Sequence, residues 1–193
     1  MALSTLALRM VSDDLIPPKD DSRVLSFCDS ICPGTKPFYV SVRLDSQSKE
    51  LQCFQNVESK VRRDGGQIVF GWNLTWVIKV YIEAQFHAVW LSPAGVYADV
   101  TPEPQPHPHL PQPQKILFLL DIDRRHNCPT VPSHRAALGD QKLVDRYFQL
   151  QDENMAIQEQ MSLAGFSFDA YVQRTQPARM ERMAILERLR NAT

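Results

Sequence analysis

Glu83-Ala-Gln-Phe-His87-Ala-Val-Trp-Leu-Ser-Pro-Ala-Gly95-Val-Tyr-Ala-Asp99-Val-Thr101 is the stretch that most clearly indicates a β-hairpin in this chain. Side chains of a strand alternate between its two faces, and Ser92-Pro-Ala-Gly95 is a natural turn sequence. If Leu91 pairs with Gly95 around a three-residue loop, His87 lies directly opposite Asp99. The hairpin therefore predicts a histidine and an aspartate on one face of an antiparallel sheet.

A cysteine begins the amphipathic segment that precedes the hairpin. From Cys53 onward, Phe54, Val57 and Val61 recur at helical spacing, and Gly65-Gly66 follows as a helix stop. A thiol in the first turn of a helix meets the positive end of the helix dipole, which favours the nucleophilic thiolate. The alternative interpretation is that Cys53 is a small buried hydrophobic residue.

Cys53, His87 and Asp99 follow the order of a thiol nucleophile, its base and the residue that orients the base. A carboxylate beside an imidazole fixes its tautomer and stabilises imidazolium. The alternative for His87 and Asp99 is a surface ion pair that contributes little. We interpret the three residues as a candidate catalytic triad.

Composition narrows the classes of protein that are compatible with this chain. Its 193 residues suit one domain with an appendage, and its net charge of −1 gives no electrostatic case for a nucleic-acid partner. No apolar run approaches the roughly 20 residues that cross a bilayer, so no membrane association is expected. Residues 1–11 lack the pattern of a signal peptide, because Arg9 interrupts their apolar stretch. We expect a cytoplasmic protein with reduced thiols, or an effector secreted by another route.

The pattern of elements predicts an α+β fold: an antiparallel sheet with a cysteine-bearing helix, plus a helical C-terminal extension. Residues 1–37 form an irregular lead-in in this interpretation, and residues 38–137 form the α+β core with a proline-rich loop at 102–113. Residues 138–193 form the helical extension, whose last helix is expected to begin near Pro177 and to carry along one face Met180, Met183, Leu186 and Leu189.

Metal and cofactor sites are not expected. Several residues have the chemistry of zinc ligands, but their spacing matches no ligand motif: His107, His109, His126, Cys128 and His134. Cys28 and Cys32 form no better motif, and no glycine-rich phosphate loop occurs.

The succession of a cysteine that opens a helix, a histidine on one strand and an aspartate on the next resembles the papain-like and transglutaminase-like cysteine enzymes. This order is more similar to the transglutaminase-like branch. The resemblance covers about residues 38–121. The resemblance implies an antiparallel α+β core, a Cys53-His87-Asp99 triad, and a thiol attack on acyl or amide groups of a protein or peptide-like substrate, without a cofactor.

The oxyanion donor is less defined. Gln47 and Gln52 precede the cysteine, as the oxyanion glutamine of papain-like enzymes does, but neither lies in a family motif, so the backbone amide of Cys53 is the expected donor. The short interval between Cys53 and His87 favours a compact hydrolase, deamidase or amide transferase over a general endopeptidase.

The main alternative is a protein-interaction module without catalysis. The methionine and leucine positions of the C-terminal helices would suit a helical protein partner or a dimer. Trp72 and Trp76 could line a substrate groove, but we expect them in the buried core.

Overall fold

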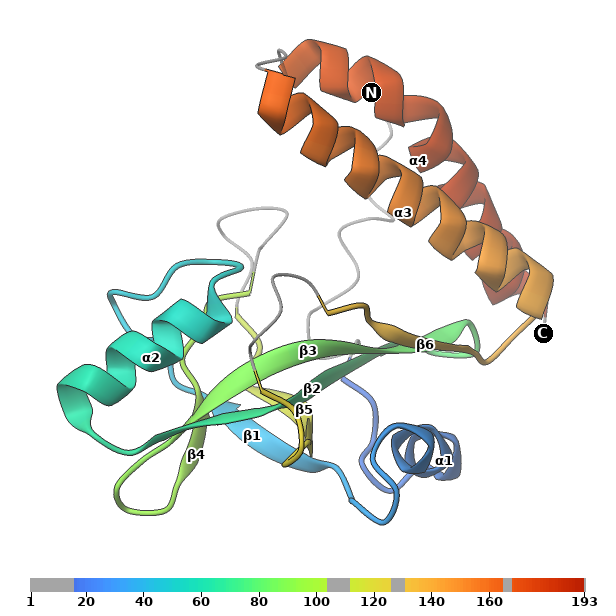
Figure 1. The fold of residues 1–193 in the computed structure, drawn as a ribbon. Helices are drawn as coiled ribbons and strands as arrows, with labels where there is room; N and C mark the ends of the chain where they lie inside the picture. The colour runs from blue at the N-terminus through green and yellow to red at the C-terminus, as the bar shows by residue number, and fades with distance from the viewer. Residues whose placement is uncertain (1–15, 104–111, 126–130, 165–167, 193) are drawn as a thin grey trace. The chain divides into compact units, whose positions relative to one another are not determined.

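The computed structural model describes residues 16–103, 112–125, 131–164 and 168–192 (Figure 1). The chain divides into two compact units. The first comprises residues 1–77 and 82–136, and the second comprises residues 78–81 and 137–193. All three residues of the candidate triad belong to the first unit.

The described part of the first unit contains α1 (Ser22–Ile31), β1 (Phe38–Val42), α2 (Cys53–Asp64), β2 (Gln67–Val77), β3 (Tyr81–Leu91), β4 (Tyr97–Asp99), β5 (Lys115–Leu120) and β6 (His134–Ala137). β3 and β6 each extend by one residue into the second unit. The expected helix that begins at Cys53 is thus confirmed.

Five of the strands form a closed barrel. Their order is β2-β5-β1-β4-β3, and an additional pairing of β2 with β3 closes the sheet, while β6 adds to β3. β1 runs parallel to β4, with Ser41 opposite Ala98 and Val42 opposite Asp99. The α+β class is therefore confirmed, but the expectation of a purely antiparallel sheet is wrong. A parallel pair requires a long connection, and here the chain passes through α2, β2 and β3 between the two strands.

Two hydrophobic clusters place β3 between the barrel core and α2. Val89 packs with Val40, Ile116 and Phe118. Its neighbour Ala88 packs instead with Val57 of α2 and with Val100. Neighbouring strand residues point to opposite faces, so β3 is held on both sides immediately after His87.

The hairpin turn differs from the expected one by one residue. Ser92 donates its N–H to the carbonyl of Val96 at 2.9 Å, so the three-residue loop is 93–95. Gly95 lies in the left-handed region with φ of 78°, where glycine carries no steric penalty. A type I turn followed by a left-handed glycine is a common three-residue hairpin loop. The predicted pairing of Leu91 with Gly95 is therefore wrong, since glycine is needed inside the loop.

The strand register shifts accordingly by two positions. Trp90 pairs with Ala98 and Leu91 with Tyr97, whereas the expected register set Val89 opposite Tyr97. Continued along the strands, this register sets His87 diagonal to Asp99 instead of directly opposite it. A shift by two residues leaves every side chain on its original face. His87 and Asp99 consequently stay on the same side of the hairpin.

The expected irregular lead-in contains a helix. Asp21 caps α1 by accepting the backbone N–H of Arg23 at 2.9 Å. The helix buries Val24, Phe27 and Cys28, which recur at helical spacing. The expectation of an irregular lead-in is therefore wrong for residues 22–31, because this apolar stripe is short and prolines and acidic residues flank it.

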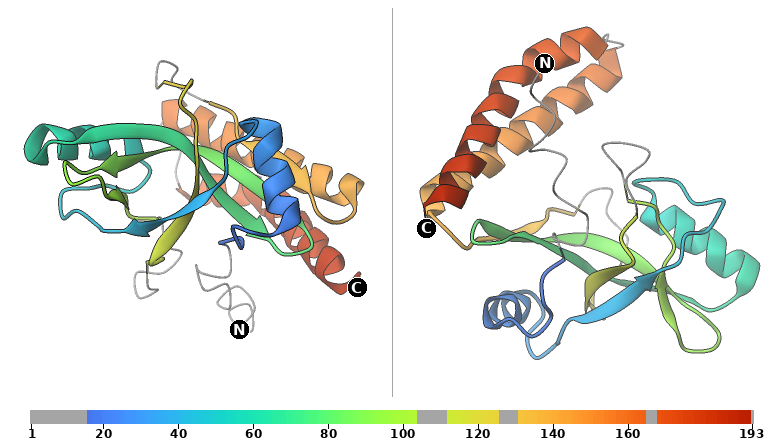
Figure 2. Two further views of the ribbon diagram at one scale, coloured as in Figure 1. Left: turned by 90° about the horizontal axis from the view of Figure 1, so that it is seen from below. Right: turned by 180° about the vertical axis from the view of Figure 1, so that it is seen from behind.

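The second unit is a hairpin of two helices, α3 (Gln141–Ala164) and α4 (Phe168–Asn191), as two views in Figure 2 show. α4 begins at Phe168, and Pro177 lies inside it, so the expected start near Pro177 is wrong. The helix buries Thr175, Ile185 and Leu189, whereas Met180 and Met183 are about half exposed. Packing of the two helices outweighs the local penalty of one proline.

Candidate active site

Cys53 is the first residue of α2, where the sequence predicted it. Its predecessor Gln52 occupies the cap position but makes no side-chain hydrogen bond to the helix. Cys53 is half-buried and not in a disulfide. Its thiol therefore lies at the positive end of the helix dipole.

His87 and Asp99 form a buried hydrogen-bonded pair. His87 Nε2 lies 3.0 Å from Asp99 Oδ2, and the side chains are 14% and 5% exposed. The other carboxylate oxygen, Oδ1, accepts the backbone N–H of Thr101 at 2.9 Å. Because a carboxylate only accepts, the proton of the His87 bond is on Nε2. This burial rules out the interpretation of the pair as a surface ion pair.

The Cys53 side chain interacts with the same imidazole and, after Asp99, contributes to its pKa. With Nε2 engaged by Asp99, Nδ1 is the ring nitrogen left for the thiol. Burial in itself lowers the pKa of His87, but the negative charge of Asp99 and hydrogen bonding to Asp99 and Cys53 outweigh it and raise the pKa to about 10. At neutral pH the structure thus favours imidazolium beside the thiol. The structure brings all three predicted site residues together.

The other described cysteines have a different environment. Burial, and secondarily the nearby Cys32, raises the pKa of Cys28 to about 12. Burial and the Asp121 carboxylate raise the pKa of Cys32 to about 11. Neither thiol forms thiolate readily near neutral pH. Cys128 lies outside the described residues.

The structure offers no metal site among the residues it describes, where no three potential ligands gather. His134 is the one described member of the candidate zinc set. It packs edge-on against Trp72, with ring centroids 4.5 Å apart. His107, His109, His126 and Cys128 lie outside the described residues.

Asn56 is a polar residue of the site that the sequence analysis overlooked. It lies one turn after Cys53 on α2 and is only 7% exposed. Its Oδ1 accepts the N–H of Lys49 at 3.0 Å, and its Nδ2 donates to the Lys49 carbonyl at 2.7 Å and to Thr101 Oγ1 at 3.1 Å. An asparagine beside Val57, on the face that a helix buries, was the available signal.

Glu103 adds a second carboxyl near the pair. Burial raises the pKa of Glu103, as does the charge of Asp99, while His87 acts in the opposite direction. Its backbone is fixed by Gln112, which accepts the Glu103 N–H at 2.8 Å and donates to its carbonyl at 2.9 Å.

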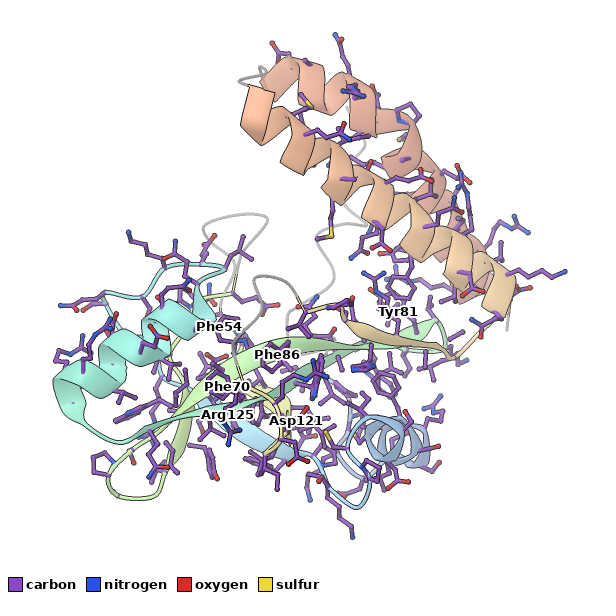
Figure 3. The ribbon with its side chains drawn as sticks, in the orientation of Figure 1. Phe54, Phe70, Tyr81, Phe86, Asp121 and Arg125 are labelled. Carbon is purple, nitrogen blue, oxygen red and sulfur yellow. The ribbon has the colours of Figure 1, made fainter. Side chains whose placement is uncertain are left out.

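Aromatic side chains pack between the start of α2 and the sheet. Phe54, Phe70 and Phe86 lie together, with centroid separations of 5.4 to 6.2 Å (Figure 3). Trp72 and Trp76 are buried, as expected of core residues. Trp72 also donates its indole N–H to Asp121 at 3.0 Å. Through Phe54, these rings pack the first turn of α2 against the sheet.

The two glutamines considered as oxyanion donors border a polar cavity of about 190 Å³ beside α2. Gln47 accepts a hydrogen bond from Arg63 Nη1 at 2.7 Å, which engages its side-chain oxygen. Gln52 is exposed. The backbone N–H of Cys53 stays the expected donor for an oxyanion.

Comparison of the chain with protein-family models, with curated proteins and with solved structures finds no significant match. The resemblance to transglutaminase-like enzymes therefore stays a prediction. Within the described ranges, no helix has both the length and the hydropathy needed to cross a bilayer.

Proposed function

We propose that this protein is a cysteine-nucleophile enzyme that acts on an acyl or amide group as a hydrolase, deamidase or amide transferase. The observation that carries the proposal is the buried His87, which is paired with Asp99 on one side and faces Cys53 on the other. A structural histidine gains nothing from a thiol at a helix start, whereas a general base requires this arrangement.

In the proposed mechanism His87 and Cys53 share a proton that lies on the imidazole when the thiolate attacks. The Sγ–C bond forms as the carbonyl π-electrons move to oxygen, where the backbone N–H of Cys53 stabilises the charge. Collapse expels the amine, which takes the proton from His87, and leaves a thioester. Water or a second amine, deprotonated by His87, then attacks the thioester and releases Cys53. Asp99 holds the ring through its hydrogen bond to Nε2.

The substrate class that fits is a protein or peptide-like amide, and the mechanism uses protein groups alone. Cys53 is half-buried at the start of α2, which packs against β3 of a small barrel. Such a site suits a protruding side-chain amide or a flexible segment of a protein.

Thiol labelling tests the proposal directly. Iodoacetamide should label Cys53 at least tenfold faster than Cys32 at pH 6, because the paired imidazolium favours thiolate. Variants C53A and H87A should abolish the fast reaction, which peptide mass spectrometry would localise. Fast labelling that survives H87A would refute the assignment of His87 as the base.

A second candidate function is favoured by the exposed methionines of the helical hairpin. Met155, Met180 and Met183 are 60%, 53% and 51% exposed. Flexible methionines suit the binding of a helical partner. In this alternative C53A would leave binding of the helical partner intact, whereas M180E with M183E would remove that binding.

A further inference from the structure

We infer that Asn56 is a positioning residue of the active site, which orients Asp99 through Thr101 and fixes the segment that leads into Cys53. The inference rests on the proposed function, since it assigns a role to a residue that does not contact the reacting atoms. The contacts then run from Asn56 through Thr101, Asp99 and His87 to Cys53, so they begin and end on the first turn of α2.

The first half of the argument concerns the segment before the cysteine. Both polar ends of the Asn56 amide bond to the backbone of Lys49, at 3.0 and 2.7 Å. Between Lys49 and Cys53, Leu51 adopts a left-handed conformation with φ of 60°, which is unfavourable for a non-glycine residue. Such a conformation persists only where its surroundings enforce it. The two bonds from Asn56 supply that constraint immediately before the nucleophile.

The second half concerns the orientation of the carboxylate. Asn56 Nδ2 donates to the hydroxyl of Thr101, which is 8% exposed. The backbone N–H of the same threonine donates to Asp99 Oδ1, while Oδ2 faces His87. Both oxygens of Asp99 are thereby committed, and its rotation is set by Thr101. Because His87 in turn faces Cys53, the contacts return to the helix three residues before Asn56.

A merely structural role for Asn56 predicts a different outcome from a positioning role. Loss of a buried amide lowers stability in either case. Only a positioning role changes how the alkylation rate of Cys53 depends on pH, because a displaced Asp99 stabilises the His87 imidazolium less. The pH at which Cys53 alkylation reaches half its maximal rate is therefore the informative measurement.

The experiment compares T101V, T101S, N56A and the control Q55A in the full chain. T101V is nearly isosteric and leaves the Lys49 clamp intact, while T101S restores the hydroxyl. N56A removes the donor to Thr101 and both bonds to Lys49 without adding a charge. Gln55 is exposed on the same helix. Circular dichroism at the labelling temperature establishes that each variant is folded.

We expect T101V and N56A to raise the half-maximal pH of Cys53 alkylation by about one unit. T101S and Q55A should match the unchanged protein. Folded T101V and N56A with an unchanged profile would overturn the role of Asn56. Slow labelling of Cys53 in the unchanged protein, or labelling insensitive to H87A, would instead overturn the proposed function, so the two failures are distinguishable.

Discussion

Replacement of Asp99 by asparagine tests the electrostatics of the site through the stability of the protein. Asparagine keeps the size of the side chain and removes its charge. His87 has a pKa raised from 6.5 to about 10, so protonation of His87 stabilises the folded state. That contribution is fully present below pH 6.5 and is lost as the pH rises toward 10.

The size of the effect follows from the geometry. Asp99 lies 3.0 Å from His87, and both side chains are shielded from solvent. An opposite charge at this distance raises the pKa of a histidine by about 1 to 3 units. Each unit corresponds to about 1.4 kcal/mol. We therefore expect D99N to lower the free energy of unfolding by about 1 to 4 kcal/mol at pH 6, and by much less at pH 10.

Urea unfolding monitored by circular dichroism between pH 5.5 and 10 provides the assay. The matched control is D20N, because the Asp20 side chain is 82% exposed. For each pH, the free energy of unfolding of D99N is subtracted from that of the unchanged protein. The subtraction removes the contribution of groups that titrate in both proteins. A difference that stays constant across this pH range would refute a protonated His87 paired with Asp99.

Three further outcomes follow from the structure. G71A should lower the melting temperature by several degrees, because a Cβ at Gly71 would overlap the Leu119 carbonyl and the Phe118 ring; an unchanged melting temperature would contradict this packing. Cys28, which is fully buried, should react with iodoacetamide only after denaturation, and native labelling at the rate of Cys32 would contradict its burial. Removal of residues 138–193 should preserve fast labelling of Cys53, since the candidate triad lies in the first unit; its loss, measured by mass spectrometry, would show that the site requires the second unit.

Local patterns were sufficient to predict the elements that carry the candidate triad. The helix start at Cys53 follows from its apolar spacing and from the glycines that end it. The common face of His87 and Asp99 follows from strand alternation, which tolerates a shift of two residues. The register itself was mispredicted because Ser92-Pro-Ala-Gly95 allows two three-residue loops. The positive φ of Gly95 selects the one that keeps glycine unpaired.

Long-range features could not be predicted in the same way. The parallel pairing of β1 with β4 joins segments more than fifty residues apart, and no local pattern encodes it. Pro177 indicated a helix start by local preference, but packing against α3 carries α4 through it. The bond from Asn56 to Thr101 depends on the seating of α2 against the hairpin, so the sequence showed only a polar residue on an apolar face.

The arrangement of β3 explains how a small barrel can hold a buried charged pair in place. A buried imidazolium and carboxylate cost desolvation energy, and small displacements would forfeit the interaction that offsets it. The two residues after His87 pack in opposite directions: Ala88 lies under α2, and Val89 lies in the barrel core. Movement of His87 along or out of the sheet would therefore disrupt one of two hydrophobic clusters. The same contact of Ala88 with Val57 packs α2, the helix that begins at Cys53, against β3.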